Sequence, residues 1–260
     1  MPLSLDLNKS ASALRLALDK AGVSTAIKAE LILDIDVSGS FEHEHEEGTT
    51  STLIERLVPY GMVLDPDGKI DVFTFSDGEA HVHRVGTVTP DEAPGYIVRN
   101  VVDRVPGWKG GTTYSYVLER NLEHFGWKPC EDRHGETDGL LSRFSRFLGF
   151  GADAPVTPHL HEKKRSIVLF VTDGENHASD EARTIRILQE SQQRGDQVYF
   201  LMIGACEHNT DDFKFLNTIA RRFKNTGVVI IRDLDSFVEL SDEELNAQLL
   251  GPELLAWLKA

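Results

Sequence analysis

Residues 31–40 read Leu-Ile-Leu-Asp-Ile-Asp-Val-Ser-Gly-Ser and decide the fold of this chain. The apolar residues at its start predict a buried strand, which we place at about Glu30–Asp36. One carboxylate, Asp36, and two hydroxyls, Ser38 and Ser40, come together where this strand ends. Carboxylate and hydroxyl oxygens are ligands of hard cations such as Mg²⁺ or Mn²⁺, whereas softer metals prefer His or Cys. The stretch therefore predicts a strand that ends in part of a cation site.

Two later segments supply the oxygen ligands that the first one lacks. Thr112 follows a pair of glycines, Gly110 and Gly111, just before a predicted helix. Asp173 follows the apolar run Ile167–Val171, which predicts the end of another strand. Ligands of open α/β sheets bind outside the carboxyl ends of the strands, so we expect the three loops to converge on one ion.

The rest of the chain predicts the kind of sheet to which these strands belong. The runs Ser166–Thr172, Gln197–Ile203 and Val228–Ile231 are apolar almost throughout, as expected of strands buried on both faces. Amphipathic helices are predicted between them, at about Asp180–Arg194 and Asp211–Phe223. This alternation predicts a doubly wound, mostly parallel α/β sheet with helices on both faces.

One edge of the sheet should differ from the rest. The segments Ile70–Phe75 and His81–Val85 flank Ser76-Asp77-Gly78, a hairpin signal that predicts an antiparallel edge strand. Gly22 and Gly61 are expected to end the two helices that precede this hairpin. Outside the regions already described, helices are predicted at about Ser10–Ala21, Thr50–Tyr60, Pro90–Val105 and Tyr114–Phe125.

The three motifs, Asp-x-Ser-x-Ser, Gly-Gly-Thr and Thr-Asp-Gly, occur in an order that resembles the metal-ion-dependent adhesion site of von Willebrand factor type A (vWA) domains. The resemblance covers roughly residues 28–240. It implies that Mg²⁺, or Mn²⁺ or Ca²⁺, is held by five residues: Asp36, Ser38, Ser40, Thr112 and Asp173. It also implies that the three hydroxyls bind directly, that the two carboxylates act mainly through ordered waters, and that a protein partner supplies a carboxylate to the remaining position. One departure is Phe41, where many members have Met.

Within that superfamily the chain is most similar to the bacterial tellurium-resistance and stress-response branch. The similarity lies in Asp71–Phe75, in Asp173–His177 and in the segment from Ser241–Leu245 to Trp257. It implies a non-enzymatic, cation-dependent protein-interaction module that acts in tellurite resistance or a related stress response.

The chain reads as one domain with additions, because no linker divides it. We expect an N-terminal extension with a short helix at 1–27, the vWA domain at 28–240 and a helical tail at 241–260. Pro252 should split this tail into two helices, since proline suits the first turn of a helix and not its interior. Residues 126–164, which are rich in Pro and Gly, read as an insertion loop.

Composition excludes several classes of partner. The net charge of −15, from 42 acidic and 27 basic residues, opposes binding to nucleic acid or to anionic membranes. The two cysteines, Cys130 and Cys206, predict neither a disulfide framework nor a zinc site. No apolar run approaches the ~20 residues of a membrane span, and the N-terminus lacks the pattern of a signal peptide. We therefore expect a cytoplasmic protein.

An enzymatic alternative starts from the same strand. Asp34-Ile35-Asp36 resembles the Asp-x-Asp motif of haloacid-dehalogenase-type phosphatases, in which the first Asp is the nucleophile and the second the acid/base. In this Mg²⁺-dependent phosphatase, Thr172 would supply the second motif. Asp233 and Asp235 would form the acidic metal-binding pair. The Gly-Gly-Thr motif would have no role.

Other polar residues near the predicted site need an explanation. Asp34 must meet a hydrogen-bond donor or a cation, or help to orient the serines of the site, because a lone buried carboxylate is costly. His43 and His45 would point to the same side of an extended segment and could then hold a transition metal, unless they are simply solvated. Asn176 and His177 are expected to shape the rim of the primary site.

Overall fold

The computed structural model describes most of the chain, namely residues 6–24, 26–129, 163–205 and 212–260. Most of the predicted insertion, residues 130–162, lies outside the described residues, as do Cys130 and Cys206.

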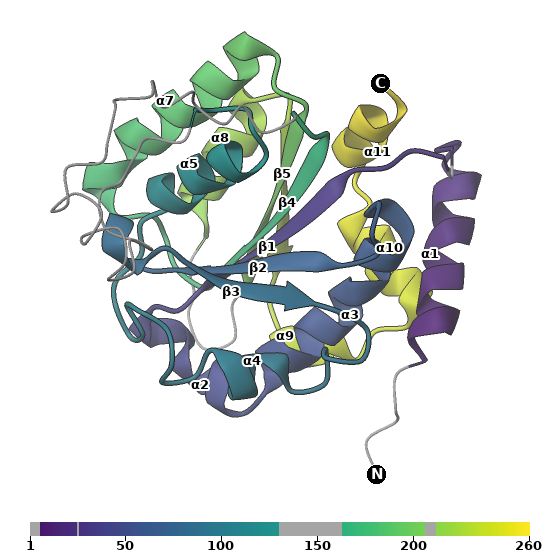
Figure 1. The fold of residues 1–260 in the computed structure, drawn as a ribbon, viewed down its shortest axis with the longest axis horizontal. Helices are drawn as coiled ribbons and strands as arrows, with labels where there is room; N and C mark the ends of the chain where they lie inside the picture. Colours follow the sequence, from purple (N-terminus) through teal and green to yellow (C-terminus); the bar gives the residue numbers. More distant parts are fainter. Residues whose placement is uncertain (1–5, 25, 130–162, 206–211) are drawn as a thin grey trace, which may run out of the picture.

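A single sheet forms the centre of the molecule, with strand order β3-β2-β1-β4-β5-β6 (Figure 1). All neighbouring strands run parallel except β2 and β3, which pair antiparallel at one edge. The predicted doubly wound, mostly parallel sheet with one antiparallel edge strand is confirmed. The strands are β1 (Glu30–Asp36), β2 (Ile70–Phe75), β3 (His83–Val88), β4 (Ser166–Thr172), β5 (Val198–Ala205) and β6 (Thr226–Ile231).

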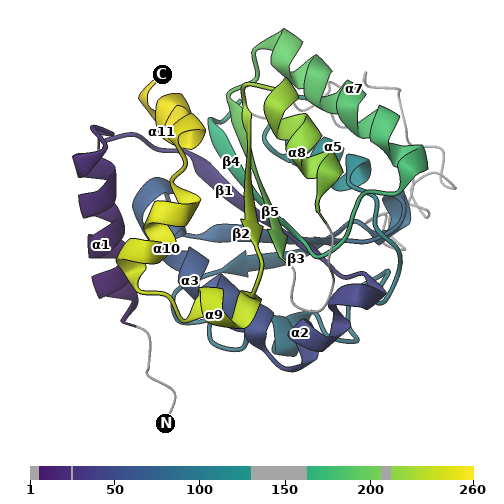
Figure 2. The ribbon, with the colours of Figure 1, turned by 180° about the vertical axis from the view of Figure 1, so that it is seen from behind.

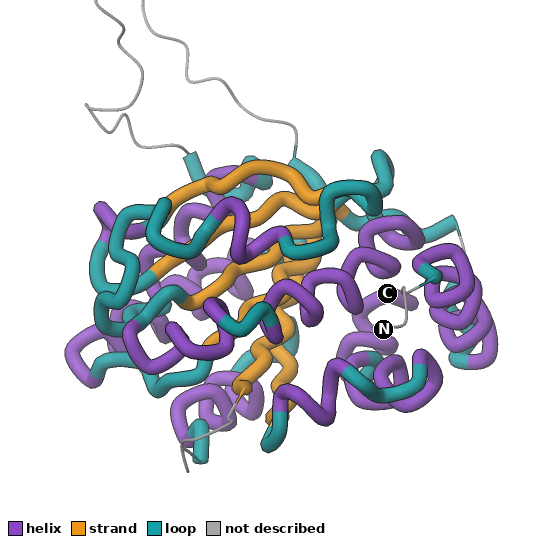
Figure 3. The backbone as a smooth tube through the Cα atoms, turned by 90° about the horizontal axis from the view of Figure 1, so that it is seen from below, coloured by secondary structure: helices purple, strands orange, loops and turns teal. Residues whose placement is uncertain are grey.

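Helices cover both faces of the sheet, as the views from opposite sides and from below show (Figures 2 and 3). The α-helices are α1 (Leu7–Lys20), α2 (Glu42–Glu46), α3 (Thr49–Leu64), α4 (Tyr96–Asn100), α5 (Ser115–His124), α7 (Ala178–Arg194), α8 (Lys214–Arg222), α9 (Leu234–Val238), α10 (Asp242–Leu249) and α11 (Pro252–Lys259). Two short 3₁₀ helices, η1 (Gly39–Phe41) and η2 (Glu79–His81), follow β1 and precede β3. None of the described helices has both the length and the apolar character that a membrane span requires.

The alternation of side chains along β1 divides the core into two layers. Leu31, Leu33 and Ile35 pack in the layer that contains α1, α3, α10 and α11, whereas Ile32 packs in the layer that contains α5, α7 and α8. Successive side chains of a strand point to opposite faces, so Asp34 and Asp36 share the face of Ile32. Both carboxylates therefore lie on the α5 side of the sheet.

The prediction that Gly61 ends a helix is wrong, because α3 continues to Leu64. A Cβ atom at Gly61 would lie 2.8 Å from Cγ1 of Ile70 and 3.0 Å from the carbonyl oxygen of Lys69. Glycine at this position therefore serves the close approach of α3 to the start of β2 rather than the end of the helix.

The prediction of a long helix at Pro90–Val105 is also wrong, since only α4 forms there. The backbone enters α4 through Gly95, which is left-handed with φ 63°, and turns left-handed again at Asp103, with φ 55°. These two positions confine the helix to one turn and a half. Strand β3 likewise begins two residues later than predicted, because η2 occupies the end of the hairpin loop.

The C-terminal tail forms two helices that break at Gly251-Pro252, as expected. The side chain of Ser241 caps α10 and forms a capping box with Glu244, and Pro252 occupies the first turn of α11. The tail packs against α1 and against β5 and β6. Its buried apolar side chains are five leucines: Leu245, Leu249, Leu250, Leu254 and Leu258.

Candidate metal site

The five residues predicted to hold a cation lie together at the carboxyl ends of β1 and β4. Ser38 Oγ lies 3.2 Å from Asp173 Oδ1 and 3.3 Å from Ser40 Oγ. Thr112, in the loop before α5, places its Oγ1 3.4 Å from Asp36 Oδ2. Three loops from distant parts of the chain therefore present two carboxylates and three hydroxyls to one small volume.

Backbone hydrogen bonds hold the first two of these loops together. The amide of Gly39 donates to the carbonyl of Gly110 at 3.0 Å, and the amide of Lys109 donates to the carbonyl of Val37 at 2.8 Å. A Cβ atom at Gly110 would lie 2.5 Å from Asp77 Oδ1 and 3.0 Å from the carbonyl oxygen of Gly107, so these neighbours would have to shift to admit a side chain. Glycine at position 110 therefore lets the loop before Thr112 lie close to Asp77.

Asp36 is completely buried and is held in place by its neighbours. The amide of Ser38 donates to its Oδ1 at 2.9 Å, and the hydroxyl of Thr172 donates to its Oδ2 at 2.6 Å. Burial and the adjacent charge of Asp173 nevertheless raise the pKa of Asp36 to about 7. The carboxyl group is therefore well ordered but short of positive charge.

Asp173 has a similar environment, and burial raises its pKa to about 6. A further contribution to the raised pKa comes from the negative charge of Glu44. Glu44 is only 5% exposed, and its Oε2 has no hydrogen-bond partner among the described residues. Sequence reasoning missed Glu44, which lies between His43 and His45, because it took this polar segment to be solvated. If residues 42–46 are placed on a helix, the helical spacing separates the side chains that point into the protein from those that face solvent.

His45 packs behind the site, so the interpretation of His45 as a solvated residue is wrong, and the alternative of a transition metal held by His43 and His45 is not supported. These residues are in the helix α2 rather than in an extended segment, so His45 is fully buried whereas the side chain of His43 is 57% exposed. His45 Nε2 lies 2.8 Å from the carbonyl oxygen of Asp36, and Nδ1 lies 2.8 Å from Thr50 Oγ1. A carbonyl can only accept, so Nε2 carries the hydrogen and donates it.

Asp34 finds the hydrogen-bond donor that its burial requires. The side-chain amide of Asn121, on α5, donates to Asp34 Oδ2 at 2.6 Å. Burial raises the pKa of Asp34 well above its ordinary value. Oδ1 of Asp34 and Oδ1 of Asn121 have no hydrogen-bond partner among the described residues.

The phosphatase alternative is not favoured by this geometry. Asp34 is fully buried against α5, so it lacks the access to substrate that a nucleophile needs. Asp233 caps α9 by accepting hydrogen bonds from Ser236, and Asp235 accepts one from Thr49. The two carboxylates assigned to metal binding thus have structural roles at the end of β6.

The two residues that were expected to shape the rim of the site, Asn176 and His177, have different roles. Asn176 is buried, and its Oδ1 accepts a hydrogen bond from the amide of Tyr114 at 3.1 Å, which ties the Thr112 loop to the Asp173 loop. His177 is exposed and caps α7 by accepting from the amide of Ser179. Sequence reasoning missed Tyr114, whose buried hydroxyl donates to the carbonyl of Gly174 at 2.5 Å. Of the two expected rim residues, only His177 is therefore exposed.

Comparison with known proteins agrees with the motifs. A family model described as "vWA found in TerF C terminus" matches residues 28–131. This part of the chain is similar to a vWA domain. The matched residues include Asp36, Ser38, Ser40 and Thr112. The predicted vWA domain is therefore supported by a comparison that is independent of the fold.

One curated protein is similar over almost the whole chain. The uncharacterized protein YcbR of Bacillus subtilis (strain 168) is 22% identical over 257 residues, which cover 98% of this chain and 87% of YcbR. Its description assigns it no activity.

Solved structures with similar folds have lower identity. Proximal thread matrix protein 1 of the mussel byssus is 18% identical over 84% of this chain, with a TM-score of 0.47, and the chain spans about half (48%) of that protein. The N-terminal domain of TFIIH p34 is 11% identical over 82% of this chain and 95% of that domain, with a TM-score of 0.47. Manganese-loaded TRAP protein of Plasmodium vivax is 16% identical over 87% of this chain and 73% of TRAP, with a TM-score of 0.43.

Proposed function

We propose that this chain is a non-enzymatic protein-interaction module whose binding depends on a divalent cation. The observation that carries the proposal is the convergence of three loops, which brings Ser38 Oγ to 3.2 Å from Asp173 Oδ1 and Thr112 Oγ1 to 3.4 Å from Asp36 Oδ2. The similarity of residues 28–131 to a vWA domain supports the same function.

The donor set fits Mg²⁺, or Mn²⁺ or Ca²⁺. Two carboxylates and three hydroxyls are oxygen ligands of the kind that hard cations take, and histidine and cysteine do not belong to the set. Burial and the charge of Asp173 raise the pKa of Asp36, so ionisation of this carboxyl group is disfavoured by its protein surroundings. A cation would supply positive charge and favour the ionised carboxylates.

The five side chains of the candidate metal site differ in their exposure to solvent. Asp36, Ser38 and Asp173 are buried, whereas Ser40 is exposed and Thr112 is partly exposed. We therefore propose that Ser38, Ser40 and Thr112 bind the ion directly and that Asp36 and Asp173 hold its ordered waters. When bound, the ion supplies an electrophile to which a carboxylate of a protein partner can add from the side of Ser40 and Thr112.

The cellular setting is a finer part of the proposal. We place this module in the cytoplasm, in tellurite resistance or a related stress response, because the matching family model describes a domain found in TerF. Removal of the gene should then lower the tellurite concentration at which the native cells stop growing. Growth identical to that of the parent strain across a tellurite series would contradict this setting while leaving the cation-dependent function intact.

The cation-dependent function is tested by capture of partners on the immobilised protein. The site variant is Thr112→Val, which removes one ligand hydroxyl from a partly exposed position and keeps the shape of the side chain. The control is Thr52→Val, which removes an exposed hydroxyl from α3. Proteins that bind wild type and the control in Mg²⁺, and that are lost in EDTA or on Thr112→Val, would support the proposal. Capture that is unchanged by EDTA and by Thr112→Val would contradict it.

A further inference from the structure

Helix α2 carries one acidic side chain whose surroundings differ from those of its neighbours. Glu44 is 5% exposed, and its Oε2 has no hydrogen-bond partner among the described residues. Glu42, in contrast, has an ion-pair partner, since its Oε1 lies 2.5 Å from Nζ of Lys109. Oε2 of Glu47 lies 3.3 Å from Nε2 of His43. A buried carboxylate without a donor or a counter-ion is costly, so Glu44 alone of these residues needs an explanation.

The backbone places Glu44 beside the candidate metal site. The chain passes from β1 through η1 into α2, and Ser40 and Glu44 are four residues apart on these consecutive turns, so their side chains are neighbours on the helix surface. Ser40 is one of the five predicted ligands, and its Oγ lies 3.3 Å from Ser38 Oγ. Nε2 of His45, the next residue, donates to the carbonyl oxygen of Asp36 at 2.8 Å. This hydrogen bond fixes α2 against the end of β1.

The charge of Glu44 acts on one of the predicted ligands. Burial and, to a smaller extent, the negative charge of Glu44 raise the pKa of Asp173 to about 6. Like charges affect each other in this way only when they are close together. Among the ion pairs of the described residues, none includes Glu44. A divalent cation bound where the three loops meet would supply the counter-charge.

We propose that Glu44 is a third carboxylate of the candidate metal site and raises its affinity for a divalent cation. The inference rests on the proposed function, because it requires that the five predicted ligands hold an ion. The affinity of an oxygen-lined site for such ions depends on the number of charged groups around it. A buried carboxylate is screened little by water, so its charge acts strongly on a nearby ion. Glu44 therefore acts through its charge, beside the hydroxyls that bind the ion directly.

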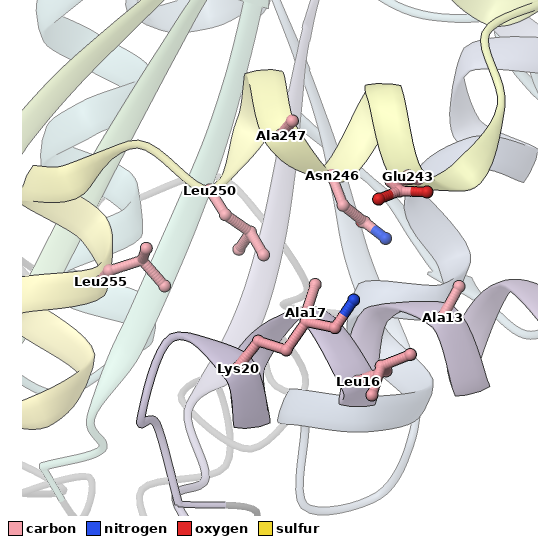
Figure 4. A pocket seen from close by; sticks show the side chains of 9 residues that line it. All are labelled: Ala13, Leu16, Ala17, Lys20, Glu243, Asn246, Ala247, Leu250 and Leu255. Carbon is pink, nitrogen blue, oxygen red and sulfur yellow. The ribbon is translucent and has the colours of Figure 1, made fainter.

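Calorimetric titration of the whole chain with Mg²⁺ tests this role. Glu44→Gln removes the charge, and Glu44→Met removes both the charge and the polar atoms, at nearly constant side-chain length. Each variant should weaken Mg²⁺ binding at least ~10-fold. Two controls remove the same charge elsewhere. They are Glu46→Gln, at an exposed position of α2, and Glu243→Gln, in the groove between α1 and α10, which none of the predicted ligands lines (Figure 4). Both controls should bind Mg²⁺ like wild type.

Thermal melts separate a role toward the ion from a purely structural role. In EDTA, Glu44→Met should melt no lower than wild type, because it removes a buried carboxylate that has no counter-ion. At one fixed Mg²⁺ concentration, the melting temperatures of wild type and Glu46→Gln should rise by more than that of Glu44→Met, since stabilisation by a ligand grows with its affinity.

The two measurements also define the results that would overturn the proposal. Wild-type affinity in Glu44→Gln and Glu44→Met would overturn it, and so would an equal loss of affinity in Glu46→Gln. A Glu44→Met variant that melts well below wild type in EDTA would show that protein contacts stabilise the carboxylate, and would overturn it as well. Absence of Mg²⁺ binding by wild type is a different failure, because it would overturn the proposed function itself and the role of Glu44 with it.

Discussion

Lowering the pH from 7 to 5 should remove a contribution that His45 makes to stability. Burial lowers the pKa of His45 to about 4, from an ordinary value of 6.5. Between these values the unfolded chain binds a proton at this residue that the folded chain does not bind. The contribution of His45 is therefore complete above pH 6.5 and is lost as the pH falls toward 4.

The size of the loss follows from the two pKa values. At pH 5, proton binding by His45 favours the unfolded over the folded state by a ratio of roughly 30, which corresponds to ~2 kcal/mol of unfolding free energy. At pH 7 the same ratio corresponds to only ~0.2 kcal/mol. No discount for solvent is needed, because His45 is fully buried. For a chain of this size the loss amounts to roughly 4–8 °C in Tm.

Other groups change in the opposite direction over the same pH range. The pKa values of Asp36 and Asp173 are raised, so their protonation below pH 7 stabilises the metal-free folded protein. The effect of His45 must therefore be measured as a difference between wild type and His45→Gln, which cannot titrate at this position. His43→Gln, on the exposed side of the same helix, is the matched control.

Urea unfolding in EDTA at the two pH values provides this difference. The free-energy advantage of wild type over His45→Gln should shrink by about 2 kcal/mol from pH 7 to pH 5. The advantage of wild type over His43→Gln should change by much less. An advantage over His45→Gln that is the same at both pH values would refute the argument from burial.

Two further predictions follow from the core and from the loop geometry. Asp34→Asn should stabilise the protein above pH 5 in thermal melts, increasingly as the pH rises. The reason is that an amide keeps a hydrogen-bonding partner for Asn121 and avoids a buried charge. A variant that is less stable than wild type at pH 8 would contradict the raised pKa of Asp34. Gly107→Ala should lower the free energy of unfolding by clearly more than Gly68→Ala in urea unfolding. Both glycines are left-handed, which costs an alanine ~1–2 kcal/mol at either position, but only at Gly107 would a Cβ atom lie 2.2 Å from Ser76 Oγ. Equal losses of stability would show that the loop around Gly107 relaxes to admit the methyl group.

The sequence predicted best those elements whose burial leaves a continuous signal. The observed bounds of β1, β2 and β4 are those predicted, because strands buried by helices read as unbroken or alternating apolar runs. Their carboxyl ends fixed the positions of Asp36 and Asp173, so the meeting of the predicted site residues followed from topology alone.

The features that sequence analysis missed depend on contacts between distant residues. Gly61 reads as the end of a helix, but its role is set by the distance to Ile70 across the core. Glu44 and His45 read as solvated, because a helix of five residues is too short for its periodicity to be recognised. The hydrogen bond from Asn121 to Asp34 joins residues 87 positions apart in the sequence, and no local sequence pattern predicts such a pair.

The central claim is that Ser38, Ser40, Thr112, Asp36 and Asp173 form a site for a divalent cation, and calorimetric titration with Mg²⁺ and Mn²⁺ tests it most directly. We expect wild type and Thr52→Val to bind one ion per chain with equal affinity. Thr112→Val and Ser38→Ala should each weaken binding at least ~10-fold, with melting temperatures in EDTA close to that of wild type. The absence of binding by wild type, or equal affinity in all four proteins, would contradict the account.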